Sequence, residues 1–126
     1  MFTTPDILII EDHDDTRRAM VCLLKAQGYQ TQAVGGGVEA LDLLQSATPR
    51  IIILDRMMPG MDGRQFLRAI RQQIRLRTIP VIDYSAALEP YSAQDVTRLG
   101  IQARVTKSAG WDELHQRVHE LIGPPK

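Results

Sequence analysis

The sequence has little of what marks several specialised classes of protein. Its single cysteine, Cys22, allows no disulfide within the chain and favours a reducing compartment. No apolar run approaches the ~20 residues that a membrane-spanning helix needs, and the first residues lack the basic and apolar regions of a secretion signal. Fifteen basic and fifteen acidic side chains leave no overall field to attract nucleic acid or an anionic membrane. These absences predict a cytoplasmic protein that binds neither nucleic acid nor a membrane directly.

The composition that remains is that of one ordinary globular domain. The chain has 126 residues, of which 44% are apolar and 24% are charged, and this suffices for a single hydrophobic core. No internal repeat or low-complexity segment divides it. We expect residues 1–122 to form the domain, and the Gly-Pro-Pro-Lys sequence of residues 123–126 to be a tail or linker.

The most informative stretch runs from Ile51 to Gly63. Three isoleucines and a leucine lead straight into Asp55, and a short apolar run of this kind is typical of a strand buried on both faces. Pro59, Gly60 and Gly63 then break the chain into a loop. Asp55 is therefore expected at the carboxyl end of a buried strand, where open α/β sheets bind their ligands. A carboxylate there is costly unless a charged group meets it.

Short apolar strands alternate with amphipathic helices along the whole chain. The pattern repeats five times, which predicts an α/β fold with a doubly wound, five-stranded parallel sheet and right-handed crossovers. The expected strands are 6–10, 29–34, 51–54, 79–83 with its continuation to residue 85, and 103–106. The expected helices are 15–27, 38–45, 64–75, 92–99 and 111–122.

Three details of these helices follow from the pattern. Asp14 or Asp15 is expected to cap the first helix, because a carboxylate accepts free backbone N–H groups at a helix start. Cys22 is expected on the packed face of that helix. In helix 64–75, the apolar face includes Ile74, and a second face carries arginines at spacings of four, three and four residues. We expect that face to be solvated, or else to be a docking stripe for an acidic partner. The arginines are Arg64, Arg68, Arg71 and Arg75.

Polar residues end four of the five expected strands, all at the same edge of the sheet. Carboxylates that converge there repel each other unless a cation joins them. Mg²⁺ is the natural cation, because it takes a few carboxylates together with water and a phosphate oxygen. Three acids, a lysine and a hydroxyl together indicate a site for a phosphoryl group on a carboxylate. The residues are Glu11 and Asp12, then Asp55, Ser85 and Lys107.

These motifs resemble those of the receiver domains of two-component response regulators, over essentially the whole chain. The matching residues are the acidic pair Glu11-Asp12, the motif Leu54-Asp-Arg-Met-Met-Pro-Gly-Met-Asp-Gly63, the hydroxyl in Tyr84-Ser-Ala86, and Lys107. The motif around Asp55 is the specific one, whereas a serine or a lysine alone would be weak. The resemblance implies a flavodoxin-like sheet with strand order 2-1-3-4-5, in which the first and third strands are neighbours.

The resemblance also implies a function and a set of roles. Asp55 would accept a phosphoryl group from a histidine kinase or a histidine phosphotransfer protein. Asp12, Asp55 and the main-chain carbonyl of Met57 would hold Mg²⁺, with Glu11 acting through water. Lys107 would neutralise charge on the phosphoryl oxygens, and a hydroxyl would then move in to hydrogen-bond the group. That hydroxyl belongs to Ser85.

Further expectations concern what such a domain does and binds. Its output would be a switched interaction surface for a downstream protein target. It would not be an enzyme beyond slow self-phosphorylation and self-dephosphorylation, and a weak homodimer is compatible with the family.

The sequence departs from the family at two positions. Most receivers have a proline in a cis peptide after the lysine, whereas Ser108 follows Lys107 here, so the loop is expected to be strained or reshaped. Three residues before the lysine, where the family has a Tyr or Phe that turns inward, stands Arg104. We expect Arg104 to remain outward or to pair with an acid, because burying a lone guanidinium is costly. The role of Asp83, an acid in an apolar strand, stays open between a wet strand end and an influence on the site.

Other interpretations of the same residues remain. The chain could be a receiver-like protein-interaction module that works without phosphorylation. An aspartate-nucleophile phosphatase would carry a second Asp two residues after the nucleophile, where this sequence has Met57. His13 beside the acids could ligate a metal, although a surface loop histidine is the simpler interpretation.

Overall fold

The computed structural model describes residues 4–55, 61–85 and 93–125. Its centre is a five-stranded parallel sheet in the order β2-β1-β3-β4-β5, which confirms the expected doubly wound α/β fold. Each strand begins or ends within two residues of the range expected from the sequence. The strands are β1 Ile7–Ile10, β2 Thr31–Val34, β3 Ile51–Leu54, β4 Val81–Ser85 and β5 Ile101–Thr106.

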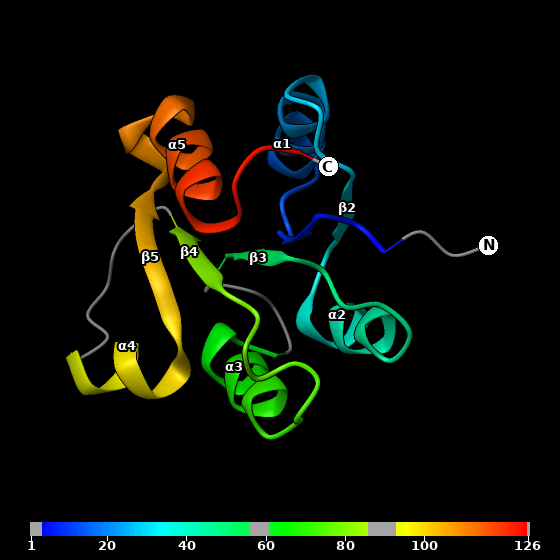
Figure 1. Cartoon of the computed structure of the whole chain (residues 1–126), viewed down its shortest axis with the longest axis vertical. Helices are drawn as coiled ribbons and strands as arrows, with labels where there is room; N and C mark the ends of the chain where they lie inside the picture. The colour runs from blue at the N-terminus through cyan, green and yellow to red at the C-terminus, as the bar shows by residue number, and fades with distance from the viewer. Residues whose placement is uncertain (1–3, 56–60, 86–92, 126) are drawn as a thin grey trace.

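Helices cover both faces of this sheet (Figure 1). On one face, α1 and α5 pack through side chains such as Leu24 and Leu114; on the other, α2, α3 and α4 pack through side chains such as Phe66 and Leu99. Two separate apolar cores result, one per face. The helices are α1 Asp14–Ala26, α2 Gly37–Leu44, α3 Gly63–Arg71, α4 Ala93–Leu99 and α5 Trp111–Ile122.

The two central strands, β1 and β3, are the most deeply buried parts of the chain. All eight of their residues have at most 1% of their surface exposed, because helices cover both faces and neighbouring strands cover both edges. Their side chains alternate between the two cores, as the period of a strand requires. Each of these strands ends in an acid, Glu11 after β1 and Asp55 after β3.

The arginine face expected on helix 64–75 is not formed, because α3 already ends at Arg71. Ile74 lies in the following turn with 78% of its surface exposed and was wrongly assigned to the apolar face. The guanidinium of Arg71 donates to five main-chain carbonyls in the segments that lead into β4 and β5, those of Leu76, Arg77, Ile79, Leu99 and Gly100. Arg71 therefore holds two connections together, which excludes it from a docking stripe.

Arg75 has a similar structural role. Its guanidinium donates to the main-chain carbonyls of Leu44 and Ala47 and to the hydroxyl of Thr48, just after α2. It satisfies carbonyls that a helix end leaves without intrahelical partners. Arg71 and Arg75 are thus bound to the protein itself, whereas Arg64 and Arg68 are exposed on α3.

Two expectations for α1 were also wrong. The helix is capped by His13, whose Nδ1 accepts the main-chain N–H of Thr16 at 3.3 Å, rather than by Asp14 or Asp15. Cys22 is exposed. The buried stripe of α1 contains Met20 and Leu24, and a residue two positions after Met20 points to the opposite side of a helix.

The amino-terminal edge of the sheet carries a partly buried ion pair. Asp6, just before β1, accepts the main-chain N–H of Gln30 at 3.0 Å and faces the Arg50 guanidinium at 3.3 Å. Arg50 also donates to the main-chain carbonyl of Ile122, at the end of α5. This pair ties together three segments that are distant in the sequence. Among the described residues, none of the helices has the length and apolar character to span a membrane.

Candidate functional site

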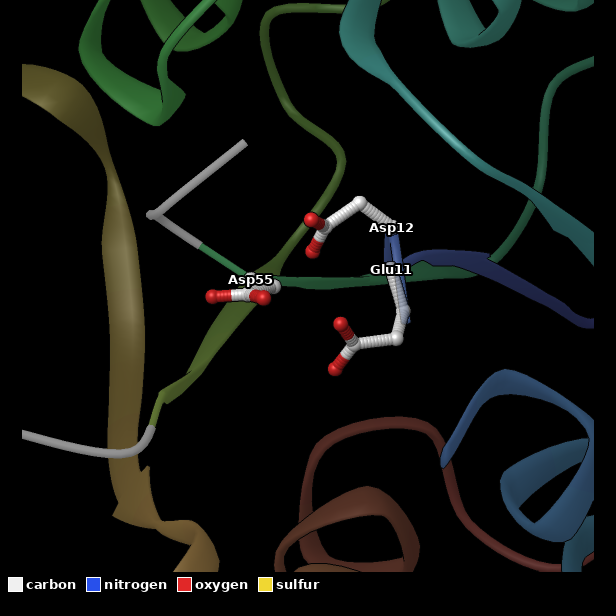
Figure 2. A group of neighbouring side chains, drawn as sticks. All are labelled: Glu11, Asp12 and Asp55. Carbon is white, nitrogen blue, oxygen red and sulfur yellow. The ribbon is translucent and has the colours of Figure 1, made fainter. Parts of the chain in front are cut away.

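Three carboxylates gather at the opposite, carboxyl-terminal edge of the sheet. Glu11 and Asp12 follow β1, and Asp55 follows β3, and their side chains point into one space (Figure 2). One carboxylate oxygen from each lies within 4.8 Å of the others. The register explains this, because Ile10 pairs with Leu54 and the next residues of both strands come side by side. The expected convergence of these three acids is confirmed.

Lys107 approaches the same space from the end of β5. Its ammonium donates to Glu11 Oε1 and lies 3.5 Å from Asp55 Oδ2. The residues after it form a short 3-10 turn, Lys107–Ala109, in which the hydroxyl of Thr106 accepts the Ala109 N–H at 3.1 Å. No cis peptide bond occurs among the described residues. The loop that follows Lys107, which has Ser108 where most receivers have a proline, is therefore reshaped into a capped turn.

Burial and charge act against each other on the two paired groups. Burial raises the pKa of Glu11 above its ordinary value and outweighs the opposing hydrogen bond from Lys107. Burial alone would lower the pKa of Lys107, but the hydrogen bond to Glu11 and the charge of Asp55 reverse this and raise its pKa. The lysine is therefore held in its charged form, while ionised Glu11 carries a desolvation cost.

The charge balance of this cluster fits a small, hard cation. Counted over the residues that the structure describes, three carboxylates against one ammonium leave two negative charges in excess when all four groups are ionised. Carboxylate oxygens at this spacing are the donor set that Mg²⁺ prefers, and it takes only a few of them. Asp12 is exposed at the mouth of the site, whereas Glu11 and Asp55 are buried. A cation could thus reach all three acids from solvent. The fourth ligand implied by the resemblance, Met57, lies outside the described residues.

Ser85 ends β4, and its hydroxyl is bound within its own strand. Its Oγ donates to Asp83 Oδ1 at 2.5 Å, and the two side chains share one face of the strand. Across β5, the Nε of Arg104 lies 3.5 Å from Asp83 Oδ2. Arg104 thus pairs with an acid, which is one of the two arrangements expected for it from the sequence. Asp83 is buried, which excludes a wet strand end.

Other residues near the site have local structural roles. His13 caps α1 with its ring nitrogen, which supports the interpretation as a loop histidine rather than a metal ligand. Asp62 caps α3 through a reciprocal pair of bonds with Gln65. Sequence reasoning missed Arg17, whose guanidinium donates to the main-chain carbonyl of Glu11 at 3.0 Å and fixes the acidic loop. A basic residue about one turn into the helix was the available signal.

Comparison with known proteins agrees with this geometry. The family model of the response regulator receiver domain matches residues 7–119. The regulatory protein AtoC of Escherichia coli K12 is 35% identical over 116 residues, which are 92% of this chain and 25% of AtoC. The chain therefore spans about a quarter of that relative's length.

Solved structures show the same fold. The receiver domain of a signal transduction histidine kinase from Syntrophus aciditrophicus is 34% identical, with a TM-score of 0.80 over 94% of this chain and 90% of that one. The response regulator TrrA of Thermotoga maritima, solved in complex with Mg²⁺ and BeF, is 28% identical. Its TM-score is 0.82, over 92% of this chain and 97% of TrrA.

Proposed function

Since the chain belongs to the response regulator receiver domain family, we propose that it accepts a phosphoryl group on Asp55 and transmits the change to a partner protein. One observation supports this most strongly. Asp55 lies at the end of the most buried strand pair, with two other acids within 4.8 Å and a lysine at 3.5 Å. A carboxylate in that position has both the negative surroundings that attract a cation and a fixed positive charge for an anionic substrate.

The chemistry proposed for Asp55 is a direct phosphoryl transfer. One carboxylate oxygen attacks the phosphorus of a phosphohistidine on a kinase or a phosphotransfer protein, and an O–P bond forms. The P–N bond breaks, and its electron pair leaves with the imidazole nitrogen. The ammonium of Lys107 would neutralise charge on the phosphoryl oxygens, and the hydroxyl of Ser85 would donate a hydrogen bond to one of them.

Mg²⁺ is the proposed cofactor. Glu11, Asp12 and Asp55 would hold it, and the ion would neutralise phosphoryl oxygens during transfer. The acid cluster with its two excess charges supports this, as does the Mg²⁺ and BeF complex of TrrA. When the ion is absent, Lys107 is the cation that keeps Glu11 and Asp55 together.

The proposed partners follow from the same chemistry. A histidine kinase or phosphotransfer protein supplies the phosphoryl group, and a downstream protein target reads the altered surface. The chain itself would not be an enzyme beyond slow self-phosphorylation and self-dephosphorylation. A cytoplasmic setting is proposed, and both the single cysteine and the nature of these partners support it.

Labelling with a small phosphodonor tests the proposal. We expect acetyl phosphate with Mg²⁺ to add one phosphoryl group to the wild-type chain, detected by intact mass, and removal of Mg²⁺ by a chelator to prevent it. Asp55→Asn should remain unlabelled yet folded, because the amide has nearly the same shape but is a poor nucleophile. The matched control is Asp6→Asn, which alters a buried acid at the other edge of the sheet and should still be labelled.

The same experiment separates the two functions that the sequence left open. Label that persists on Asp55→Asn would show that another residue is the acceptor. If the wild-type chain is folded, binds Mg²⁺ and still takes no label from acetyl phosphate or from phosphohistidine donors, the chain works as an interaction module without phosphate.

A further inference from the structure

The proposed chemistry makes no use of Asp83, although this acid contacts one of the residues that it does use. Asp83 and Ser85 lie on the same face of β4, and the side chain of Asp83 is 2% exposed while Ser85 is completely buried. The serine hydroxyl donates to Asp83 Oδ1 at 2.5 Å. A hydrogen bond to a buried carboxylate is among the stronger kinds in proteins.

Arg104 completes this arrangement from the neighbouring strand. A register shift between β4 and β5, after Val81, places Arg104 directly opposite Asp83. Its Nε lies 3.5 Å from Asp83 Oδ2, and its side chain is 23% exposed. The arginine therefore neutralises a buried carboxylate from the surface side of the sheet. Ser85, Asp83 and Arg104 form one connected group, which we call the β4–β5 triad.

The serine hydroxyl has a single proton to donate. In the structure that proton goes to Asp83, on the face of the sheet covered by α2, α3 and α4. A phosphoryl oxygen on Asp55 would be a competing acceptor for the same proton. Ser85 can therefore serve the phosphoryl group only by giving up its bond to Asp83.

We propose that Asp83 is a positioning residue that holds the Ser85 hydroxyl away from the phosphorylation site, and that Arg104 sets how tightly it is held. This inference rests on the proposed phosphorylation of Asp55. When the hydroxyl leaves, the buried carboxylate loses a donor, and Arg104, whose Nε lies 3.5 Å from Oδ2, is the charged group placed to compensate. The arginine then moves closer to Asp83, which passes the change to the surface of β5 without any aromatic side chain.

The two charged members of the triad are predicted to act in opposite directions. Removing the charge of Asp83 weakens its hold on the hydroxyl and favours the phosphorylated form. Removing Arg104 leaves Asp83 more dependent on Ser85 and disfavours that form. An ion pair with only a structural role would instead give effects of the same sign, since breaking it from either side removes the same interaction.

The test measures the affinity for beryllofluoride in the presence of Mg²⁺, with beryllofluoride as the probe for the phosphoryl group. We expect Asp83→Asn to bind roughly five- to tenfold more tightly than wild type, because a neutral amide oxygen is a weaker acceptor than a carboxylate. Arg104→Gln should bind roughly two- to fivefold more weakly. In a Ser85→Ala background both effects should shrink, because the hydroxyl that links them to the site is gone. Ser85→Thr, which keeps a hydroxyl, should retain them.

Several results would overturn the inference. If Asp83→Asn has the same effect with and without the Ser85 hydroxyl, its action is plain charge repulsion. Equal and same-sign losses in Asp83→Asn and Arg104→Gln, matched by equal losses of stability, would make the pair structural. If Asp83→Asn does not fold, Arg104→Gln in the two Ser85 backgrounds decides the question. If the wild-type chain does not bind beryllofluoride, both the proposed function and the proposed role of the β4–β5 triad are contradicted.

Discussion

The two edges of the sheet contain the same kinds of residue and differ in their balance of charge. At the amino-terminal edge, Asp6 faces one arginine, Arg50, and also accepts a main-chain N–H. At the carboxyl-terminal edge, Asp55 shares one lysine, Lys107, with Glu11, and a third acid, Asp12, lies beside them. Asp6 and Asp55 are buried to nearly the same extent, with 6% and 7% of their surface exposed. Burial of an acid therefore does not distinguish the two edges.

Charge balance does distinguish them. Asp6 and Arg50 neutralise each other, so that pair is complete and holds three chain segments in place. The carboxyl-terminal cluster has more negative charge than its lysine can neutralise. Such an arrangement lowers the stability of the free protein and is retained where a ligand completes it. The first edge serves stability, and the second serves binding.

The largest expected effect of a single change is at the amino-terminal edge. Arg50→Ala leaves Asp6 as a buried charge without its cation and should lower the free energy of unfolding by about 2–4 kcal/mol. Urea denaturation followed by circular dichroism measures this. Arg18→Ala is the matched control, because Arg18 and Asp15 form an ion pair at 2.8 Å that is largely exposed, and its loss should cost less than about 1 kcal/mol. Similar losses for both variants would show that the partly buried pair contributes no more to stability than an exposed one.

Asp→Asn changes at the two edges should alter stability in opposite directions. Asp6→Asn loses charge-assisted hydrogen bonds and should lower the free energy of unfolding by about 1–3 kcal/mol. Asp12→Asn relieves repulsion in the cluster and should raise it by roughly 0.5–1 kcal/mol when Mg²⁺ is absent. Both variants are measured by urea denaturation in a chelator. A loss of stability in Asp12→Asn would contradict the charge excess on which the comparison rests.

A smaller effect is expected in the pH dependence of stability. Because the pKa of Glu11 is raised in the folded protein, the folded state binds a proton more readily than the unfolded state. The contribution of Glu11 therefore makes the free energy of unfolding fall as pH rises from the ordinary pKa of a glutamate to the raised one. Glu11→Gln should remove this part of the slope in metal-free protein. If the pH dependence of stability is unchanged in Glu11→Gln, it arises from other groups.

At the alkaline end, Lys107 makes a contribution of the same sign, at higher pH. Its raised pKa means that its stabilising effect is present below the ordinary pKa and is lost as pH rises through the raised one. Lys107→Gln should flatten this alkaline loss, measured by thermal unfolding at a series of pH values. An alkaline loss of the same size in Lys107→Gln would contradict the ion pair with Glu11.

Most of the fold and the acid cluster could be predicted from the sequence, because both depend on local signals. Apolar runs that end in acids predicted β1 and β3, and the expected helix 111–122 agrees with α5 at both ends. What the sequence could not provide depends on tertiary structure. The cap by His13 depends on backbone geometry, and the binding of Arg71 to five carbonyls requires two connections to meet. The contact between Asp83 and Arg104 depends on a register shift between strands.

The central claim is that the excess negative charge at the carboxyl-terminal edge makes a site for Mg²⁺. Titration of Mg²⁺ into the nitrogen-15-labelled protein, followed by amide chemical shifts, tests it most directly. We expect saturable shifts at Asp12, Asp55 and Lys107 that are lost or greatly weakened in Asp12→Asn and unchanged in Asp6→Asn. Shifts that do not saturate, or that saturate at the same Mg²⁺ concentration in Asp12→Asn as in wild type, would contradict it.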